Sequence, residues 1–223
     1  MSKDVLYEMN QDNLRKYFNK YTRKAFQILP DLDKPRILDI GCGSGVPTIE
    51  LAKLSDGEII GMDINQSSLD LLNRKIKEEG FSNRVKTLKC SLFEIDFPNE
   101  TFDIIWTEGS IFIIGFKKGL KEWNRLLKHN GFLVIHDLLI NISEKIKMIP
   151  ECGYKLINYF LLPEEVWWVK YYKPLEIRIK ELRVKYKNDP EALKIFQKYQ
   201  SEIDKVKMNP KVYGSVFYIL QKE

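Results

Sequence analysis

The first thirty residues carry apolar side chains at regular intervals. Leu14, Phe18, Tyr21, Ala25 and Ile28 follow one another at spacings of 4, 3, 4 and 3 residues. Such spacing places the side chains on one face of a helix, because an α-helix has 3.6 residues per turn. The pattern therefore predicts a helix over residues 11–29.

From residue 36 onward, short apolar runs alternate with amphipathic stretches and turn residues. The apolar runs predict strands, which cover residues 36–40, 58–63, 84–89, 102–107 and 132–137. The amphipathic stretches predict helices, which cover residues 47–54, 66–79 and 117–128. Alternation of strands and helices indicates a parallel sheet joined by right-handed crossovers.

Beyond Pro150 the pattern changes. Two further strands are predicted over 154–162 and 213–221, with helices over 174–187 and 190–207 between them. A connection of about fifty residues must pack as structure of its own. We expect it to form a helical cap over the carboxyl ends of the strands.

These elements predict an α/β fold with a doubly wound, Rossmann-like sheet of seven strands. The sheet is expected to be mostly parallel, with an antiparallel C-terminal strand. We expect a single domain over 1–223, with an N-terminal helical lid over 1–35 and a core over 36–150. The C-terminal strands then lie within 151–223, and the cap covers approximately 163–208.

Composition narrows the class of protein. The chain has 223 residues, of which 44% are hydrophobic and 30% charged, and its net charge is +5. Acidic and basic residues are interspersed without a long basic run, so no nucleic-acid partner is expected. No apolar segment is long enough to span a membrane, and the N-terminus lacks the apolar region of a signal peptide. We therefore expect no membrane partner and a cytoplasmic protein.

Cysteine and histidine usage argues against a metal site. Cys42, Cys90 and Cys152 lie far apart, and the chain has two histidines. This pattern fits neither a disulfide framework nor a zinc site, and it is typical of a reducing compartment. Cys90 is interpreted as a small buried residue rather than a nucleophile.

The most informative segment is the apolar run 36–40 with the turn that follows it. The run ends in Gly41-x-Gly43-x-Gly45, and Pro47 then begins the predicted helix. Proline suits a first helical turn because its φ is fixed and its missing N–H would have no partner there. A strand that leads through a glycine turn into a helix is typical of a nucleotide-binding crevice.

The glycine spacing excludes a dinucleotide site. That fingerprint needs a third glycine, and its position is occupied by Val46 or by Thr48, depending on the register. Asp39 instead lies two residues before the first glycine of the turn. A carboxylate there suits a cationic ligand and would repel a pyrophosphate.

The pattern Asp39-x-Gly41-x-Gly43-x-Gly45 resembles motif I of the class I S-adenosylmethionine-dependent methyltransferases. The resemblance extends over residues 36–137 and is strongest to the methyltransferase type 11, or ubiquinone/menaquinone methyltransferase-like, group. It implies that S-adenosyl-L-methionine is the cofactor and S-adenosyl-L-homocysteine the product. It also implies that the turn, including Cys42, contacts the cofactor, whose ammonium and sulfonium groups are cationic.

Asp63 ends the second predicted strand, 18 residues after Gly45. An acid at this place in a doubly wound sheet accepts hydrogen bonds from ribose hydroxyls. The resemblance implies a bidentate ribose contact, with Met62 and Ile64 beside the adenine. The alternative is a helix N-cap, a role that Asn65 can fill.

The loop after the third predicted strand departs from the family pattern. Residues 90–103 resemble the family's stretch Gly-Asp-Ala…Leu-Pro-Phe-Pro-Asp-x-x-Phe-Asp, but Ser91 stands where the family usually has the aspartate for the adenine amino group. A serine hydroxyl accepts more weakly than a carboxylate. We therefore expect adenine binding to involve the backbone at Leu92 as well.

Two further candidates follow the fourth and fifth predicted strands. The loop Trp-Thr-Glu-Gly-Ser, which contains Glu108, lacks the Asn/Asp-Pro-Pro-Tyr motif that methyltransferases of adenine, cytosine or glutamine carry. Glu108 is a candidate for holding the cofactor ammonium, orienting a substrate or acting as a base. His136 is a candidate proton acceptor, and a packing role is the alternative. His129 is expected to face solvent.

Aromatic residues in the lid and the cap allow two interpretations each. The resemblance implies that the N-terminal helix, with Tyr17, Tyr21 and Arg23, closes over the cofactor carboxylate; an ordinary packing helix is the alternative. The cap aromatics could form a cage for an apolar or cationic substrate, or simply the core of the cap. They are Trp167, Trp168, Tyr171 and Tyr172.

The resemblance implies methyl transfer to a small-molecule acceptor by in-line displacement, with Glu108 and His136 as candidate catalytic residues. The protein would then mainly align the partners and exclude water. An RNA or protein methyltransferase is one alternative, and a non-catalytic S-adenosylmethionine-binding protein is the other. The protein is expected to be a monomer or a homodimer.

Overall fold

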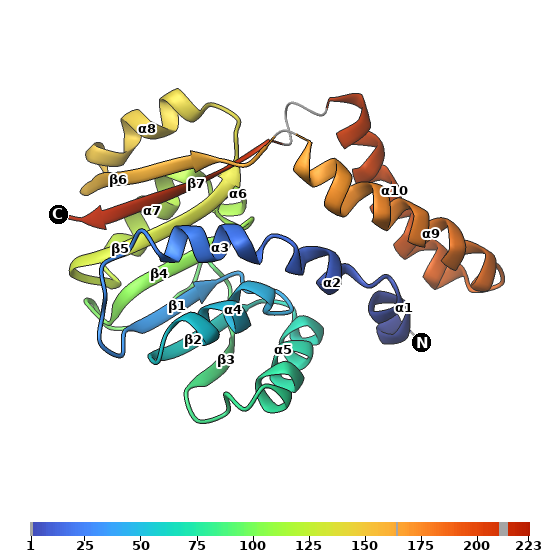
Figure 1. Cartoon of the computed structure of the whole chain (residues 1–223), viewed down its shortest axis with the longest axis horizontal. Helices are drawn as coiled ribbons and strands as arrows, with labels where there is room; N and C mark the ends of the chain where they lie inside the picture. Colours follow the sequence, from blue (N-terminus) through green and yellow to red (C-terminus); the bar gives the residue numbers. More distant parts are fainter. Residues whose placement is uncertain (1, 164, 210–213) are drawn as a thin grey trace. The chain divides into compact units, whose positions relative to one another are not determined.

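The computed structural model describes residues 2–163, 165–209 and 214–223. The chain forms two compact units. The sheet unit comprises residues 19–161 and 215–223. The helical unit comprises residues 1–18 and 162–214. Figure 1 shows the secondary structure of both.

The sheet unit is built on one seven-stranded sheet with the order β3-β2-β1-β4-β5-β7-β6. The first five of these strands pair in parallel, and β7 runs antiparallel to both β5 and β6. The strands are β1 (Arg36–Ile40), β2 (Glu58–Asp63), β3 (Val85–Lys89), β4 (Phe102–Glu108), β5 (Leu127–Leu138), β6 (Tyr154–Leu161) and β7 (Ser215–Lys222). The predicted fold class is confirmed. Tyr213, where the last predicted strand begins, lies outside the described residues.

Helices cover both faces of this sheet, with α3 and α4 in front of it and α7 behind it in Figure 1. The helices of the unit are α3 (Asn19–Phe26), α4 (Val46–Leu54), α5 (Gln66–Glu78), α6 (Ile111–Ile114), α7 (Phe116–Asn124) and α8 (Ile142–Glu151). Their apolar faces bury the central strands: Leu38, Ile105 and Leu133 have no exposed surface. Near-complete apolar runs are expected for parallel strands that are covered on both faces.

The helical unit contains α1 (Ser2–Glu8), α2 (Gln11–Lys16), a π-helical turn η1 (Trp168–Tyr172), α9 (Lys173–Lys185) and α10 (Pro190–Met208). Asp189 caps α10 by accepting from two backbone N–H groups, at 3.1 Å each. The Lys185 ammonium bonds to the Glu8 carboxylate at 2.6 Å and so joins α9 to α1. No helix in the described part of the chain is both long enough and apolar enough to cross a membrane.

Three predicted boundaries were wrong. The helix predicted over 11–29 is two helices, α2 and α3, because Phe18 turns inward and stacks on Trp167 at 4.1 Å. The helix predicted over 117–128 ends at Asn124. The strand predicted from residue 132 begins at Leu127. Phe102 on β4 pairs with Leu127 and Ile104 pairs with Phe132, so β5 contains an irregularity between these two pairs and extends further back than its apolar run.

Candidate functional site

The glycine turn after β1 is held against the end of β2 by backbone hydrogen bonds. The N–H groups of Gly41 and Cys42 both donate to the carbonyl of Met62 at 2.9 Å. The N–H of Gly43 donates to the Asp63 carboxylate, also at 2.9 Å. The turn and the predicted ribose-binding acid therefore form one structure at the carboxyl edge of the sheet.

Gly43 and Gly45 of this turn differ in what surrounds the position of a Cβ atom. Gly45 has a φ of +79°, and a Cβ there would overlap the side chain of Leu72 on α5. Gly43 has a φ of +54°, and a Cβ there would meet nothing within 4 Å. Gly45 thus allows close packing of the helices, whereas Gly43 leaves the backbone of the turn open on its outer side.

Asp63 is half-buried and uses one oxygen for each of two backbone donors. Oδ2 accepts from Gly43, and Oδ1 accepts from the N–H of Asn65 at 2.8 Å. A carboxylate offers about four acceptor positions, so each oxygen retains capacity for a further donor. The N-cap alternative is filled by Asn65, whose side chain accepts from the N–H of Ser68.

Asp39 is buried, with an exposed fraction of 1%. Its Oδ2 accepts a hydrogen bond of 2.6 Å from the Thr48 hydroxyl on α4. The pKa of Asp39 is raised to about 7, chiefly because burial disfavours the charged form. The Thr48 hydrogen bond lowers this pKa, and the charges of Glu108 and Asp63 contribute to raising it. Three acids therefore lie close together at the carboxyl edge of β1, β2 and β4.

The residues predicted to lie beside an adenine surround the same edge. Ile64 follows β2 with 69% of its surface exposed, whereas Ser91 and Leu92 are half-buried in the loop after β3. That loop is fastened to the site because the N–H of Cys90 donates to the Asp63 carbonyl at 3.1 Å. An exposed isoleucine next to a carboxylate provides an apolar contact beside hydrogen-bond acceptors.

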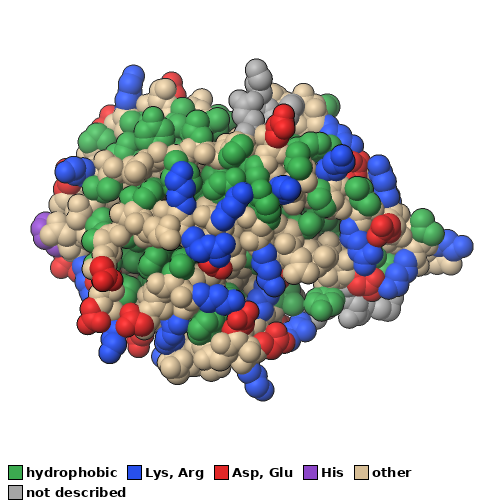
Figure 2. Space-filling model, viewed as in Figure 1, with side chains coloured by type: hydrophobic (Ala, Val, Ile, Leu, Met, Phe, Trp, Pro, Cys, Tyr) green, Lys and Arg blue, Asp and Glu red, His purple; other side chains and the backbone are tan. Residues whose placement is uncertain are grey.

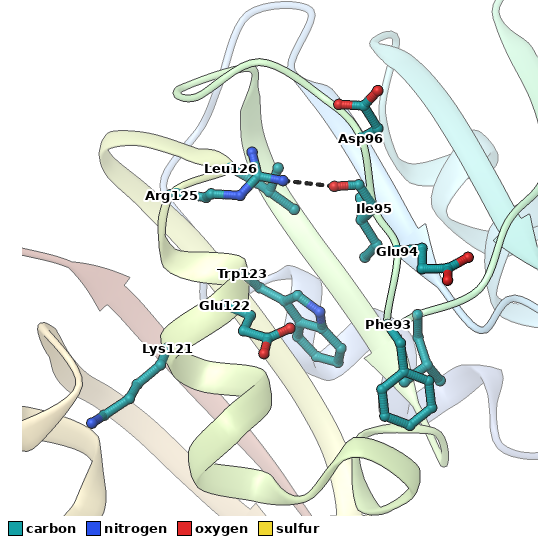
Figure 3. Close-up of a pocket in the computed structure, with 10 residues that line it drawn as sticks. Phe93, Glu94, Ile95, Asp96, Lys121, Glu122, Trp123, Arg125 and Leu126 are labelled. Carbon is teal, nitrogen blue, oxygen red and sulfur yellow. Dashed lines mark hydrogen bonds between the residues drawn. The ribbon is translucent and has the colours of Figure 1, made fainter.

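A pocket of about 480 Å³ lies between this loop and α7 (Figure 3). Leu92 to Asp96 form one wall, and the C-terminal half of α7 with Arg125 and Leu126 forms the other. The Arg125 guanidinium holds the loop by donating to the Ile95 carbonyl at 2.6 Å, the dashed line in Figure 3. The glycine turn does not line this pocket.

Cys42 and the lid residue Arg23 have partners within the protein, and their contacts with the cofactor stay predictions. Cys42 is buried, burial raises the pKa of its thiol, and its Sγ lies 3.6 Å from the Gly43 carbonyl. Arg23 on α3 pairs with the buried Glu50 carboxylate at 2.5 Å, so its charge is engaged within the protein. Tyr21 is half-buried on α3.

Glu108 ends β4, and its side chain is 3% exposed. Its Oε1 accepts from the Thr22 hydroxyl at 2.8 Å and from the Trp106 indole N–H at 3.0 Å. Its Oε2 lies 3.8 Å from Nδ1 of His136. The carboxylate therefore connects α3, β4 and β5 at the carboxyl edge of the sheet.

His136 is 4% exposed and lies on β5 next to Glu108. Its Nε2 shares a hydrogen bond of 2.9 Å with the Ser215 hydroxyl, and its ring stacks on Phe217 at 4.4 Å. The structure thus brings the two candidate catalytic residues together. Thr22 and Ser215 contact these two residues and were not predicted from the sequence. Thr22 could have been noticed because it is a polar residue next to the apolar face of its predicted helix.

The predicted cap aromatics lie in the helical unit, where Trp167, Tyr171 and Tyr172 pack with one another. Trp167 is 9% exposed and stands edge-to-face with Tyr171 at 5.7 Å. The Tyr172 hydroxyl donates to the Glu202 carboxylate at 3.0 Å. These contacts favour the interpretation as the core of the unit, and a cage role stays a prediction. Tyr17 belongs to the same unit, with Lys170 over its ring.

Comparisons with known proteins agree with this geometry. Residues 37–131 match the family model described as "Methyltransferase domain". The chain is 28% identical over 131 residues to an uncharacterized protein of Haemophilus influenzae, with 57% of this chain and 52% of that protein covered. It is 27% identical over 163 residues to the ubiquinone/menaquinone biosynthesis C-methyltransferase of Teredinibacter turnerae. That alignment covers 72% of this chain and 63% of the relative.

A solved structure shows the same fold over nearly the whole chain. It is an S-adenosylmethionine-dependent methyltransferase from Geobacter sulfurreducens in complex with S-adenosyl-L-homocysteine, with a TM-score of 0.76. The alignment covers 92% of this chain and 91% of that one at 17% identity. The chain spans about half the length, or less, of the first curated relatives that it matches.

Proposed function

Because this chain belongs to the class I S-adenosylmethionine-dependent methyltransferases, we propose that it transfers a methyl group from S-adenosyl-L-methionine to a small-molecule acceptor. The observation that carries the proposal is the joint structure of the glycine turn and Asp63. The open outer side of Gly43 lets a ligand approach the backbone, and the Asp63 carboxylate lies beside it. These are the features that a nucleoside requires at this edge of a doubly wound sheet.

The charges of the site fit this cofactor better than a phosphate-bearing one. Asp39, Asp63 and Glu108 lie close enough for the charges of Asp63 and Glu108 to raise the pKa of Asp39. A ligand with an ammonium and a sulfonium group would be attracted to this edge, whereas a pyrophosphate would be repelled. Ile64 and Leu92 would supply the apolar contacts for the adenine, and Ser91 a hydrogen bond.

The bound cofactor would supply an activated methyl group, which leaves the sulfonium as the acceptor atom attacks. The chain's own residues would position the two molecules and exclude water. For an acceptor that loses a proton, we propose His136 as the proton acceptor, with Glu108 beside its Nδ1 to orient it. Tyr21 is proposed to lie near the cofactor.

Calorimetry tests the cofactor site. Asp63→Ala should weaken S-adenosyl-L-methionine and S-adenosyl-L-homocysteine binding by about tenfold or more, because a pair of charge-assisted hydrogen bonds is lost. Asp63→Asn, which retains an oxygen for the Gly43 N–H, should fall between this variant and the wild type. The exposed Asp33→Ala is the matched control. Equal affinities for Asp63→Ala and Asp33→Ala would remove the site assignment.

Methyl transfer needs its own test. Cofactor labelled in the methyl group would be incubated with a small-metabolite mixture, with total RNA and with a protein extract, and the label followed in each fraction. We expect label in the small-molecule fraction. Label in RNA or protein would favour the macromolecular alternative, and tight cofactor binding without transfer to any fraction would favour a sensor.

A further inference from the structure

Helix α9 carries an unusual exposed face. Lys173, Ile177, Lys180, Val184 and Lys187 follow one another at spacings of 4, 3, 4 and 3 residues, which places them along one side of the helix and its C-terminal turn. All five are exposed, and the exposed fractions of Ile177 and Val184 are 52% and 74%. We call these five residues the α9 stripe.

The charge of the α9 stripe is positive. Glu181 at its border pairs with Arg178 at 2.9 Å. Glu176 lies 3.5 Å from Lys180, but its carboxylate is largely buried and also accepts from Lys207 at 2.6 Å. Lys173 and Lys187 stand at the two ends of the stripe. Figure 2 shows basic and hydrophobic side chains, together with a smaller number of acidic ones, over the region of α9 and α10.

We propose that the α9 stripe adsorbs to an anionic lipid bilayer surface. Helices that lie in a membrane interface combine apolar side chains, which enter the headgroup region, with lysines, which contact anionic headgroups. Alternation of two aliphatic residues with three lysines gives one exposed side both functions. Lysine stems can also extend along the lipid while their ammonium groups stay in water.

The composition of the α9 stripe favours a bilayer over two other partners. A nucleic acid would use the lysines but would leave Ile177 and Val184 exposed to water. A second copy of the same stripe would bring lysines against lysines, which is repulsive. The proposed contact is peripheral, and it does not depend on the proposed methyl transfer.

Vesicle co-sedimentation tests the proposal with the full chain. Wild type should bind vesicles of equal phosphatidylcholine and phosphatidylglycerol about tenfold more tightly than pure phosphatidylcholine vesicles, because lysines near an anionic surface are stabilised. Half-molar salt should weaken this binding by screening. Lys173→Gln/Lys187→Gln should weaken it about tenfold as well. Lys198→Gln/Lys205→Gln on α10 removes the same charge outside the stripe and is the control.

The aliphatic residues need a separate variant. Ile177→Ser/Val184→Ser leaves the charge unchanged and should also weaken binding to anionic vesicles by about tenfold, since less apolar surface enters the bilayer. Both residues are exposed, and unchanged circular dichroism would show that the fold is retained. Equal binding by the stripe variants and the α10 control would overturn the proposal. A concentration-dependent dimer in light scattering that the serine variant abolishes would assign the stripe to a second copy instead.

Discussion

The hydroxyl of Thr22 donates a hydrogen bond of 2.8 Å to the carboxylate of Glu108, and this contact fastens α3 to the carboxyl end of β4. Thr22 is 1% exposed, and the Glu108 side chain is 3% exposed. A buried carboxylate depends strongly on such donors because it has little water to replace them.

Thr22→Val should therefore destabilise the protein. The substitution keeps the shape of the side chain but removes one of the donors to Glu108, which should lower the free energy of unfolding by about 1–3 kcal/mol. Urea denaturation measures this change. Thr22→Ser retains the hydroxyl and is the control; a Val variant within about 0.5 kcal/mol of the Ser variant would contradict the prediction.

The two glycines of the turn should respond differently to alanine. Gly45→Ala combines a left-handed backbone with an overlap on Leu72, so we expect a loss of about 3 kcal/mol or more in unfolding free energy. Gly43→Ala has open space around the new methyl group, so only the backbone strain of about 1 kcal/mol remains.

Gly43→Ala should have its main effect on cofactor affinity rather than on stability. A methyl group at Gly43 stands on the outer side of the turn, where the proposed ligand approaches, so the folded Gly43→Ala protein should bind S-adenosyl-L-homocysteine about tenfold more weakly or worse. Calorimetry on the folded variant gives the answer. Unchanged affinity would place the ligand away from the turn.

Asp39 predicts a pH dependence of stability in the absence of cofactor. Its pKa is about 7 in the folded protein, against an ordinary value of 3.8 for an aspartate. Between these two pH values the native state holds a proton that the unfolded chain has lost. The stability contributed by this group is present below the unfolded pKa and is lost as the pH rises through the folded one. Stability should therefore fall with rising pH across this window.

The comparison with Asp39→Asn isolates that contribution. The wild-type unfolding free energy should fall relative to the variant by about 1.4 kcal/mol per pH unit within the window and level off above it. Denaturant titrations at several pH values measure the difference. A difference that does not change with pH would mean that Asp39 is ionised throughout.

Sequence predicts the part of the site that the sheet topology determines. The turn at Gly43 and the acid at Asp63 follow adjacent parallel strands, so topology rules alone bring them to one edge. The Thr22 contact with Glu108 spans 86 residues and depends on how α3 lies across the sheet, which a local pattern does not encode. The same holds for Ser215 beside His136, 79 residues away.

Errors in element boundaries have a similar cause. The periodic pattern through Phe18 is continuous, but the residues before and after it belong to different compact units, so the helix is interrupted there. The four residues Ile111–Ile114 form a short helix that a uniform apolar run could not reveal, because such a run has no period. In both places tertiary packing, rather than the local sequence pattern, determines where the helix begins and ends.

Activity variants at His136 test the proposed proton acceptor. His136→Gln keeps a polar group that can bond to Ser215, and His136→Phe keeps a ring that can stack on Phe217. If the imidazole accepts a proton from the acceptor, both variants should lower kcat by about 100-fold or more while the cofactor Kd stays unchanged. The rates would be measured with the acceptor identified by labelled methyl transfer. A full kcat in the Phe variant would show instead that the ring of His136 serves packing.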